Sequence, residues 1–176
     1  MLRGLSEEGH TVDRGYKENL DDLPPVSSYD AIYTAVRDPI ARNISYLFEM
    51  NGSRLLREKA QLECIKEEFI AIDQTYSLDW FDDVFFPATG VDVYKYDFPP
   101  SGVLLIGKIC VLRMEQMKFE HRADTKLTRP YGVLYKEFLD WVKFDDVYIN
   151  RMYSSKLVAH FFTDIEVKQL RDRWSE

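Results

Sequence analysis

Apolar residues along the chain predict a buried strand that leads directly into an amphipathic helix. Residues 31–36 are apolar and β-prone, so we expect a strand there. From Pro39 onward apolar residues recur at helical spacing, and we expect Asp38 to be the N-cap of this helix. Asn51 and Gly52 are expected to end it. A strand, a short turn and a helix N-terminus in this order bind anions in many α/β proteins, through free backbone N–H groups.

The same spacing predicts further helices in the rest of the chain. They cover residues 53–72, 78–86, 130–142 and 148–162. The second of them is rich in aromatic residues, and we expect Pro87 and Gly90 to stop it. Thr163 and Glu166 have the spacing of a capping box, which predicts a last helix that runs to Trp174.

Three other segments have the composition of strands. They are residues 91–98, 103–106 and 109–114. We interpret Gly107 and Lys108 as a hairpin corner between the second and the third. The third is expected to be a central strand that runs parallel to residues 31–36.

The composition of the chain is consistent with one folded domain and argues against one class of binding partner, the nucleic acids. The chain has 176 residues, of which 45% are hydrophobic, enough for one core. We expect this core in an α/β domain over residues 29–176, after a polar arm over residues 1–28. The 23 Lys and Arg residues are outnumbered by 30 Asp and Glu residues, and the net charge of −7 argues against general binding of nucleic acids. No apolar run is long enough to span a bilayer and residues 1–22 are too polar for a signal peptide, so we expect a cytoplasmic protein.

Cysteine and histidine residues show no metal-binding pattern. Cys64 and Cys110 are far apart in the sequence, and we interpret both as buried free thiols. His10, His121 and His160 do not have the spacing of metal ligands, so no metal cofactor is predicted.

Two arginines and a serine around the start of the first predicted helix are candidates for binding an anion. Arg37 lies in the turn, and Arg42 and Ser45 lie on the helix away from the centre of its apolar stripe. Guanidinium groups offer a planar fork of donors to phosphate oxygens, and a hydroxyl adds one more donor. Asp38 would repel a phosphate, so we interpret it as the helix cap and the partner of an arginine. The alternative is that all these residues only cap the helix and carry surface charge.

This helix start resembles the 3′-phosphate-binding motif of the sulfotransferases. Its residues follow the pattern Arg-Asp-Pro-x-x-Arg-x-x-Ser from Arg37 to Ser45, directly after a hydrophobic strand. The resemblance implies that Arg37 and Ser45 hold the 3′-phosphate of the co-substrate 3′-phosphoadenosine 5′-phosphosulfate (PAPS). It also implies that Arg42 matches the second arginine of many carbohydrate sulfotransferases. Later segments resemble the bacterial capsular polysaccharide synthesis protein family, itself sulfotransferase-like; they are residues 80–83, 89–94, 111–115, 152–156 and 160–162.

These resemblances imply a fold and a chemistry. The implied fold is the P-loop-NTPase-like sulfotransferase fold, with a small parallel sheet, flanking helices and a helical C-terminal part. The implied chemistry is sulfuryl transfer from PAPS to a carbohydrate hydroxyl during capsular or surface polysaccharide synthesis. The 3′-phosphate site would serve only to place the donor.

One part of the family pattern is missing before residue 31. Sulfotransferases hold the 5′-phosphosulfate with a loop of the Lys-x-Gly-Ser or Lys-x-Gly-Thr type, and no such segment is found there. We therefore expect an N-terminally incomplete member that does not transfer sulfuryl groups by itself. No catalytic base is assigned, because His10 lies in a polar segment and His160 is interpreted as structural. Two other hypotheses stay open: a non-catalytic remnant or interaction domain in which Arg37 and Ser45 are only structural, and a glycosyltransferase accessory protein.

Three further groups of residues have both a functional and a structural interpretation. Aromatic side chains of one predicted helix could line an acceptor pocket or pack in the core; they are Trp80, Phe81, Phe85 and Phe86. The basic residues of the polar loop 118–128, together with Arg129, could contact sulfate or an anionic acceptor or be ordinary surface. Ser154, Ser155 and Lys156 could form a second surface for the co-substrate or acceptor, or the polar face of a packed helix.

Overall fold

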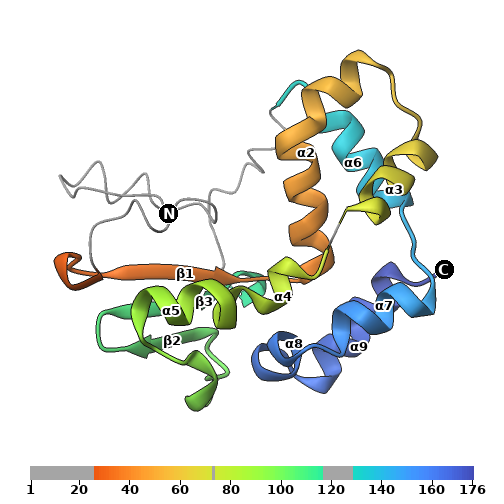
Figure 1. Cartoon of the computed structure of the whole chain (residues 1–176). Coiled ribbons are helices and arrows are strands. Elements are labelled where there is room, and N and C mark those ends of the chain that lie inside the picture. The colour runs from red at the N-terminus through yellow and green to blue at the C-terminus, as the bar shows by residue number, and fades with distance from the viewer. Residues whose placement is uncertain (1–25, 73, 117–128) are drawn as a thin grey trace.

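The computed structural model of this chain describes residues 26–72, 74–116 and 129–176, and these residues are mostly helical around one small sheet (Figure 1). Most of the predicted polar arm and the whole of the predicted polar loop at residues 118–128 lie outside the described residues, and so does His10. The prediction of an α/β fold is confirmed.

Three strands form the sheet, in the order β1-β3-β2. β1 (Ile32–Val36) runs parallel to β3 (Ile109–Arg113), so the prediction of a central parallel strand is confirmed. β2 (Val103–Ile106) pairs with β3 in the antiparallel direction. The sheet is therefore mixed and not parallel, because the tight corner at Gly107, where φ is 58°, joins β2 and β3 as a hairpin.

The register of the parallel pair brings the carboxyl ends of β1 and β3 to one edge of the sheet. Val36, the last residue of β1, lies opposite Arg113, the last residue of β3. Arg37 follows the first strand, and a short 3₁₀ turn, Met114–Gln116, follows the second. In α/β sheets this edge is where ligands usually bind.

Helix α2 (Pro39–Arg57) begins as predicted and ends later than predicted. Asp38 is its N-cap and accepts the Ile40 N–H with one carboxylate oxygen at 3.0 Å. Gly52 lies inside the helix because the ring of Tyr131 packs directly on it; a Cβ at this position would lie 2.6 Å from the ring. The glycine thus permits a close helix contact and does not stop the helix.

The predicted helix over residues 53–72 is wrong, because the chain turns in its middle. Its first residues complete α2, and a separate helix, α3 (Leu62–Ala71), follows. Lys59 takes a left-handed conformation with φ of 51°, and the Ala60 N–H donates to the Leu55 carbonyl, which closes the end of α2.

The aromatic-rich segment is helical but consists of three parts in succession. They are α4 (Tyr76–Trp80), a π-helical turn (Phe81–Phe85) and α5 (Phe86–Thr89). Pro87 does not stop the helix, since it lies in the first turn of α5, where its missing N–H costs no bond within that helix. Gly90 ends it with φ of 71°, as predicted.

Residues 91–98 do not form the predicted strand. They contain a 3₁₀ turn, Val93–Lys95, because the Asp92 side chain accepts the Tyr94 N–H at 3.1 Å and bends the backbone.

The C-terminal part contains four helices. α6 (Gly132–Trp141) is followed by α7 (Asp146–Tyr153), α8 (Lys156–Phe161) and α9 (Asp164–Trp174). The single helix predicted over residues 148–162 is wrong: Ser155 caps a new helix by accepting the Val158 N–H. The predicted capping box of Thr163 and Glu166 is confirmed.

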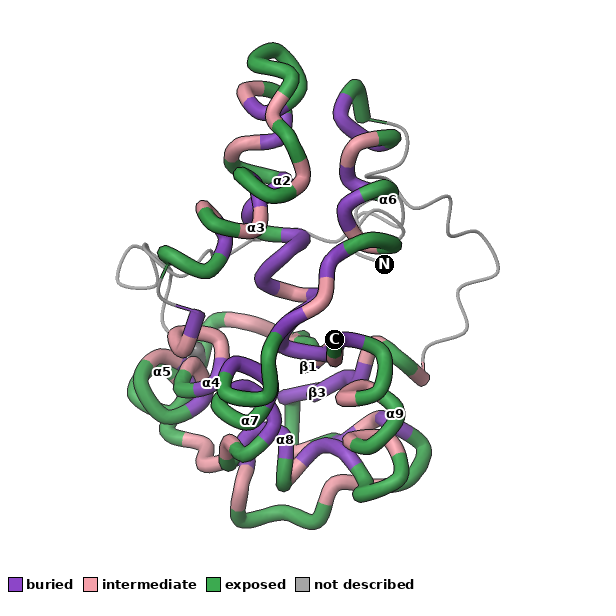
Figure 2. The backbone as a smooth tube through the Cα atoms, turned by 90° about the vertical axis from the view of Figure 1, so that its right-hand side faces the viewer, coloured by how far each residue is buried: buried purple, intermediate pink, exposed green. Residues whose placement is uncertain are grey.

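The helices surround the carboxyl edge of the sheet. α4 and α5 lie across one sheet face, α2 rises from the end of β1 beside α6, and α7, α8 and α9 gather beyond the strand ends (Figure 1). β3 is buried along its whole length (Figure 2). Cys110 on β3 is buried as predicted, whereas Cys64 on α3 is exposed, so that part of the prediction is wrong.

Candidate functional site

Arg37 and Ser45, eight residues apart, are joined by a hydrogen bond. Arg37 Nη1 donates to Ser45 Oγ at 3.3 Å across the first two turns of α2. Ser45 is 6% exposed, and its hydroxyl lies 3.0 Å from the hydroxyl of Tyr135 on α6. Sequence reasoning missed Tyr135, because no pattern relates a residue of α6 to one of α2 that lies 90 positions earlier.

A pocket of about 160 Å³ lies at the carboxyl end of β1. Arg37 and Arg42 line one part of it, and Trp80 and Phe81 line another. Ser45 is not among its lining residues. The structure therefore brings Arg37 together with both other predicted residues, but it places Arg42 on the pocket side of α2 and Ser45 on the side that faces α6.

Arg42 is a half-buried cation with no acidic partner in the described part of the chain. Its Nη1 donates to the Asn43 side-chain oxygen at 3.0 Å, and its guanidinium carbon lies 5.4 Å from the centre of the Tyr46 ring. Partial burial lowers the pKa of Arg42, Tyr46 and Tyr76 raise it in part, and the positive charge of Arg37 lowers it again.

Among the described residues, no carboxylate lies within 4.0 Å of the guanidinium nitrogens of Arg37 or Arg42. Two like charges therefore share one small pocket without an opposite charge in ion-pair contact. An anion bound there would relieve their repulsion and replace part of the hydration that burial removes.

Among the described residues the Asp38 carboxylate makes no ion pair with an arginine, so its predicted role as an arginine partner is wrong there. Asp38 is 2% exposed, and its Oδ1 accepts the Ile40 N–H and the hydroxyl of Tyr153, the latter at 2.7 Å. Its Oδ2 accepts the indole N–H of Trp174 at 2.8 Å. Uncharged donors from α7 and α9 take the place that we assigned to an arginine, because the C-terminal helices pack against this turn.

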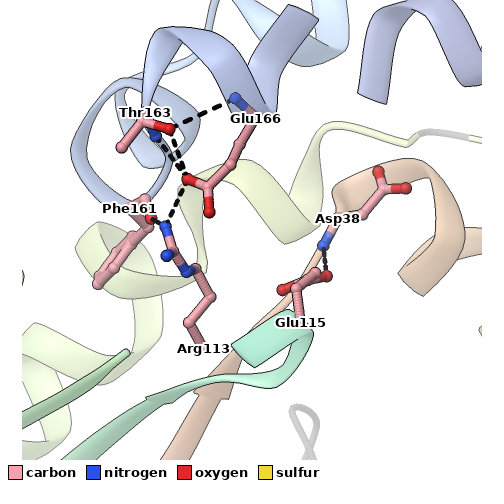
Figure 3. A network of polar contacts seen from close by, with 6 residues as sticks. All are labelled: Asp38, Arg113, Glu115, Phe161, Thr163 and Glu166. Carbon is pink, nitrogen blue, oxygen red and sulfur yellow. Dashed lines mark hydrogen bonds and ion pairs between the residues drawn. The ribbon is translucent and has the colours of Figure 1, made fainter. Parts of the chain in front are cut away.

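Two backbone N–H groups at the start of α2 are already bound within the protein. Pro39 has no N–H, and the Ile40 N–H is bound by the Asp38 carboxylate. The N–H of Asp38 itself donates to Glu115 Oε1 at 2.6 Å, while its carboxylate points away from Glu115 (Figure 3). The N–H groups of Asp38 and Ile40 are therefore not free to bind an anion, contrary to the expectation from the sequence, which leaves the arginine side chains as the principal donors.

The Arg113 side chain, at the end of β3, is bound by other residues of the fold. Its side chain is 4% exposed, and its Nη1 donates to the Phe161 carbonyl at 2.6 Å and to Glu166 Oε2 at 2.9 Å (Figure 3). The same Glu166 oxygen accepts the N–H and the hydroxyl of Thr163 in the capping box. Partial burial alone would raise the pKa of Glu166, but the bonds from Thr163 and the charge of Arg113 together hold it below its usual value.

The aromatic residues that we considered for an acceptor pocket divide between the two interpretations. Phe81 and Phe85 are buried in the core, and Phe86 is exposed. Trp80 and Phe81 line the pocket, so Phe81 has both roles.

Ser154, Ser155 and Lys156 all make contacts within the protein. Ser155 caps α8, and Ser154 Oγ accepts a hydrogen bond from Arg171 at 3.4 Å. Lys156 Nζ lies 2.7 Å from an Asp82 carboxylate oxygen and 3.8 Å from the centre of the Tyr94 ring. These contacts agree with the structural interpretation of this segment.

His160 packs edge to face on the Tyr94 ring with centroids 5.1 Å apart. Its Nε2 is buried and has no hydrogen-bond partner within the described ranges, and burial lowers the pKa of the imidazole. It lies outside the residues that line the pocket.

No group of three or more His, Cys, Asp or Glu side chains in the described part of the chain is placed to hold a metal ion. No helix among the described residues combines the length and the apolar character needed to cross a membrane. Comparison with protein-family models, with curated proteins and with solved structures found no match to this chain.

Proposed function

We propose that this chain binds the 3′-phosphate of PAPS through Arg37, Arg42 and Ser45, as a sulfotransferase-like protein of capsular or surface polysaccharide synthesis. In this proposal its sheet and flanking helices belong to a P-loop-NTPase-like sulfotransferase fold, and the acceptor is a carbohydrate hydroxyl. The proposal concerns the placement of the donor and assigns no catalytic base.

The observation that carries the proposal is the pair of unneutralised arginines in the pocket. Structural arginines with restricted exposure are normally paired with acids, as Arg113 is with Glu166. Arg37 and Arg42 have no acid in ion-pair contact among the described residues, although the chain as a whole is acidic. A phosphate group would supply the missing negative charge through charge-assisted hydrogen bonds worth about 1.5–3 kcal/mol each.

The size and location of the pocket support a small oxyanion. Its volume of about 160 Å³ is below the roughly 300–1,000 Å³ of sites that enclose a whole drug-sized ligand. One phosphate group could enter, and the remainder of a nucleotide would lie outside the pocket. The position at the carboxyl end of β1, beside the end of β3, is the edge at which α/β proteins usually bind ligands.

Calorimetric titration with adenosine 3′,5′-bisphosphate tests the proposal. Arg37→Gln removes one charge-assisted bond, so the dissociation constant is expected to rise about 10- to 150-fold. Arg57→Gln is the matched control, because it removes the same charge from an exposed position at the other end of α2. No binding by the unmodified chain, or equal losses in the two variants, would refute the proposal.

A second candidate function is that of a non-catalytic interaction domain in which Arg37 and Ser45 only stabilise the fold. The hydrogen bonds that join Arg37, Ser45 and Tyr135 favour it, since they tie three elements together without a ligand. Arg37→Gln would then lower the melting temperature and leave nucleotide titrations featureless in every variant.

A further inference from the structure

We propose that Tyr153 and Trp174 are positioning residues for the anion site. Their uncharged donors hold the Asp38 carboxylate, so that it does not neutralise the neighbouring Arg37. The inference rests on the proposed function and adds two residues to the site. Tyr153 and Trp174 lie 115 and 136 positions after Asp38 in the sequence.

An aspartate beside a phosphate-binding arginine needs an explanation. Asp38 follows Arg37 directly, and an ionised carboxylate this close would both repel an anion and compete for the guanidinium group. The structure instead gives Asp38 three donors, all of them uncharged: the Ile40 N–H, the Tyr153 hydroxyl and the Trp174 indole N–H.

Both side chains are suited to hold a buried carboxylate without adding charge. An indole N–H can only donate, so Trp174 offers the Asp38 carboxylate a donor and cannot itself accept a hydrogen bond from an arginine. Burial raises the pKa of Tyr153, and the negative charge of Asp38 raises it further, so the phenol remains a protonated donor throughout the physiological range. Both side chains are themselves buried, which keeps water from replacing them.

This arrangement leaves the positive charge of the pocket intact. Because uncharged donors of the described residues hold the Asp38 carboxylate, it makes no ion pair with the guanidinium groups of Arg37 or Arg42, and both remain available to a ligand. If the Tyr153 hydroxyl is lost, Asp38 Oδ1 retains only the Ile40 N–H, and if the Trp174 indole is lost, Oδ2 loses its donor. Either loss is unfavourable for a buried carboxylate, and the guanidinium of the adjacent residue offers the strongest replacement.

Removal of one donor, followed by removal of the carboxylate charge, tests the inference. Tyr153→Phe deletes only the hydroxyl, and the affinity for adenosine 3′,5′-bisphosphate is expected to fall about five- to tenfold. The rescue is tested on Trp174→Phe, which deletes the other donor and should lower the affinity to the same extent. Adding Asp38→Asn to this variant should restore the affinity to within about twofold of the unmodified chain, because the asparagine oxygen still caps the helix and accepts from Tyr153, while its NH2 group takes the side of the deleted indole and carries no charge to compete for Arg37. A purely structural role predicts no such rescue.

Tyr148→Phe is the matched control. Tyr148 lies on the same helix and is also buried, but its hydroxyl has no hydrogen-bond partner among the described residues, so its loss should leave the affinity unchanged. If Tyr153→Phe does not fold, as judged by circular dichroism, Trp174→Phe with and without Asp38→Asn still tests the inference.

The outcomes separate this inference from the proposed function. Binding by the unmodified chain that Tyr153→Phe leaves unchanged, or a loss in Trp174→Phe that Asp38→Asn does not reverse, would overturn the inference alone. Failure of the unmodified chain to bind adenosine 3′,5′-bisphosphate would overturn both.

Discussion

The ion pair between Glu166 and Arg113 gives the sharpest test of how the C-terminal helix is fixed to the sheet. Glu166→Ala removes two contacts at once: the acceptor of the capping box with Thr163 and the carboxylate that neutralises Arg113. The matched control is Asp172→Ala, which removes an acid of the same helix from an ion pair with Lys168 whose side chains are 77% and 64% exposed.

The expected magnitudes differ because the two pairs differ in burial. Loss of a capping interaction costs about 1 kcal/mol, and loss of a charged hydrogen-bond partner costs about 1.5–3 kcal/mol. Arg113 is almost fully buried and cannot be rehydrated, so we expect Glu166→Ala to lower the free energy of unfolding by about 3 kcal/mol. The exposed pair of Asp172 should contribute at most about 0.5 kcal/mol.

Thermal and urea unfolding, followed by circular dichroism, measure both changes. For a chain of this size 1 kcal/mol corresponds to a shift of about 2–4 °C, so Glu166→Ala should lower the melting temperature by about 6–12 °C. Because the pKa of Glu166 is held below its usual value, its ionised form stabilises the fold above the unfolded-state pKa near 4.3, and this contribution is lost as the pH falls through the lower folded-state pKa.

Glu166→Gln isolates the charge, because its amide oxygen can still accept the bonds from Thr163. The difference in stability between this variant and the unmodified chain should shrink below about pH 4. A cost of Glu166→Ala no larger than that of Asp172→Ala would refute the reasoning, as would a Glu166→Gln difference that does not change with pH.

Three further predictions concern other parts of the structure. Gly52→Ala gains about 0.5–1 kcal/mol of helix propensity but forces the Tyr131 ring to move, at a cost of about 1–3 kcal/mol, so urea unfolding should show a net loss of stability; a gain would contradict the close contact. Since burial lowers the pKa of His160, the unfolded chain takes up that proton first and stability should fall as the pH drops below about 6.5; His160→Gln should remove this slope, and a slope that persists would point to another group. Exposed Cys64 should react with a thiol reagent in the folded chain, whereas buried Cys110, whose pKa burial raises, should react only on unfolding; equal rates would contradict this.

Local features of the sequence were sufficient where neighbouring residues complete each other's hydrogen bonds. The start of α2 follows from Asp38 and Pro39, and the start of α9 follows from Thr163 and Glu166. The corner at Gly107 likewise identifies the hairpin between β2 and β3. Each prediction needs only residues within one or two turns of backbone.

Predictions failed where a distant part of the chain changed the role of a residue, or where a local cap or turn interrupted a continuous pattern. Gly52 resembles a helix stop, but it allows the Tyr131 ring to pack on α2. The single helix predicted across Ser155 is interrupted because Ser155 caps α8. The amphipathic pattern after Gly52 is continuous in sequence, and only the fold reveals that the chain turns at Lys59.

The candidate site likewise has features that follow from the local sequence and features that depend on the tertiary structure. The eight-residue spacing of Arg37 and Ser45 is a property of the sequence, because Ser45 lies on the second turn of α2 and the long Arg37 side chain reaches it from the residue before the N-cap. The roles of Asp38 and of its partners Tyr153 and Trp174 were decided only by the tertiary structure. Which donor a buried carboxylate finds depends on the elements that pack against it, and these come from parts of the chain that no local pattern connects.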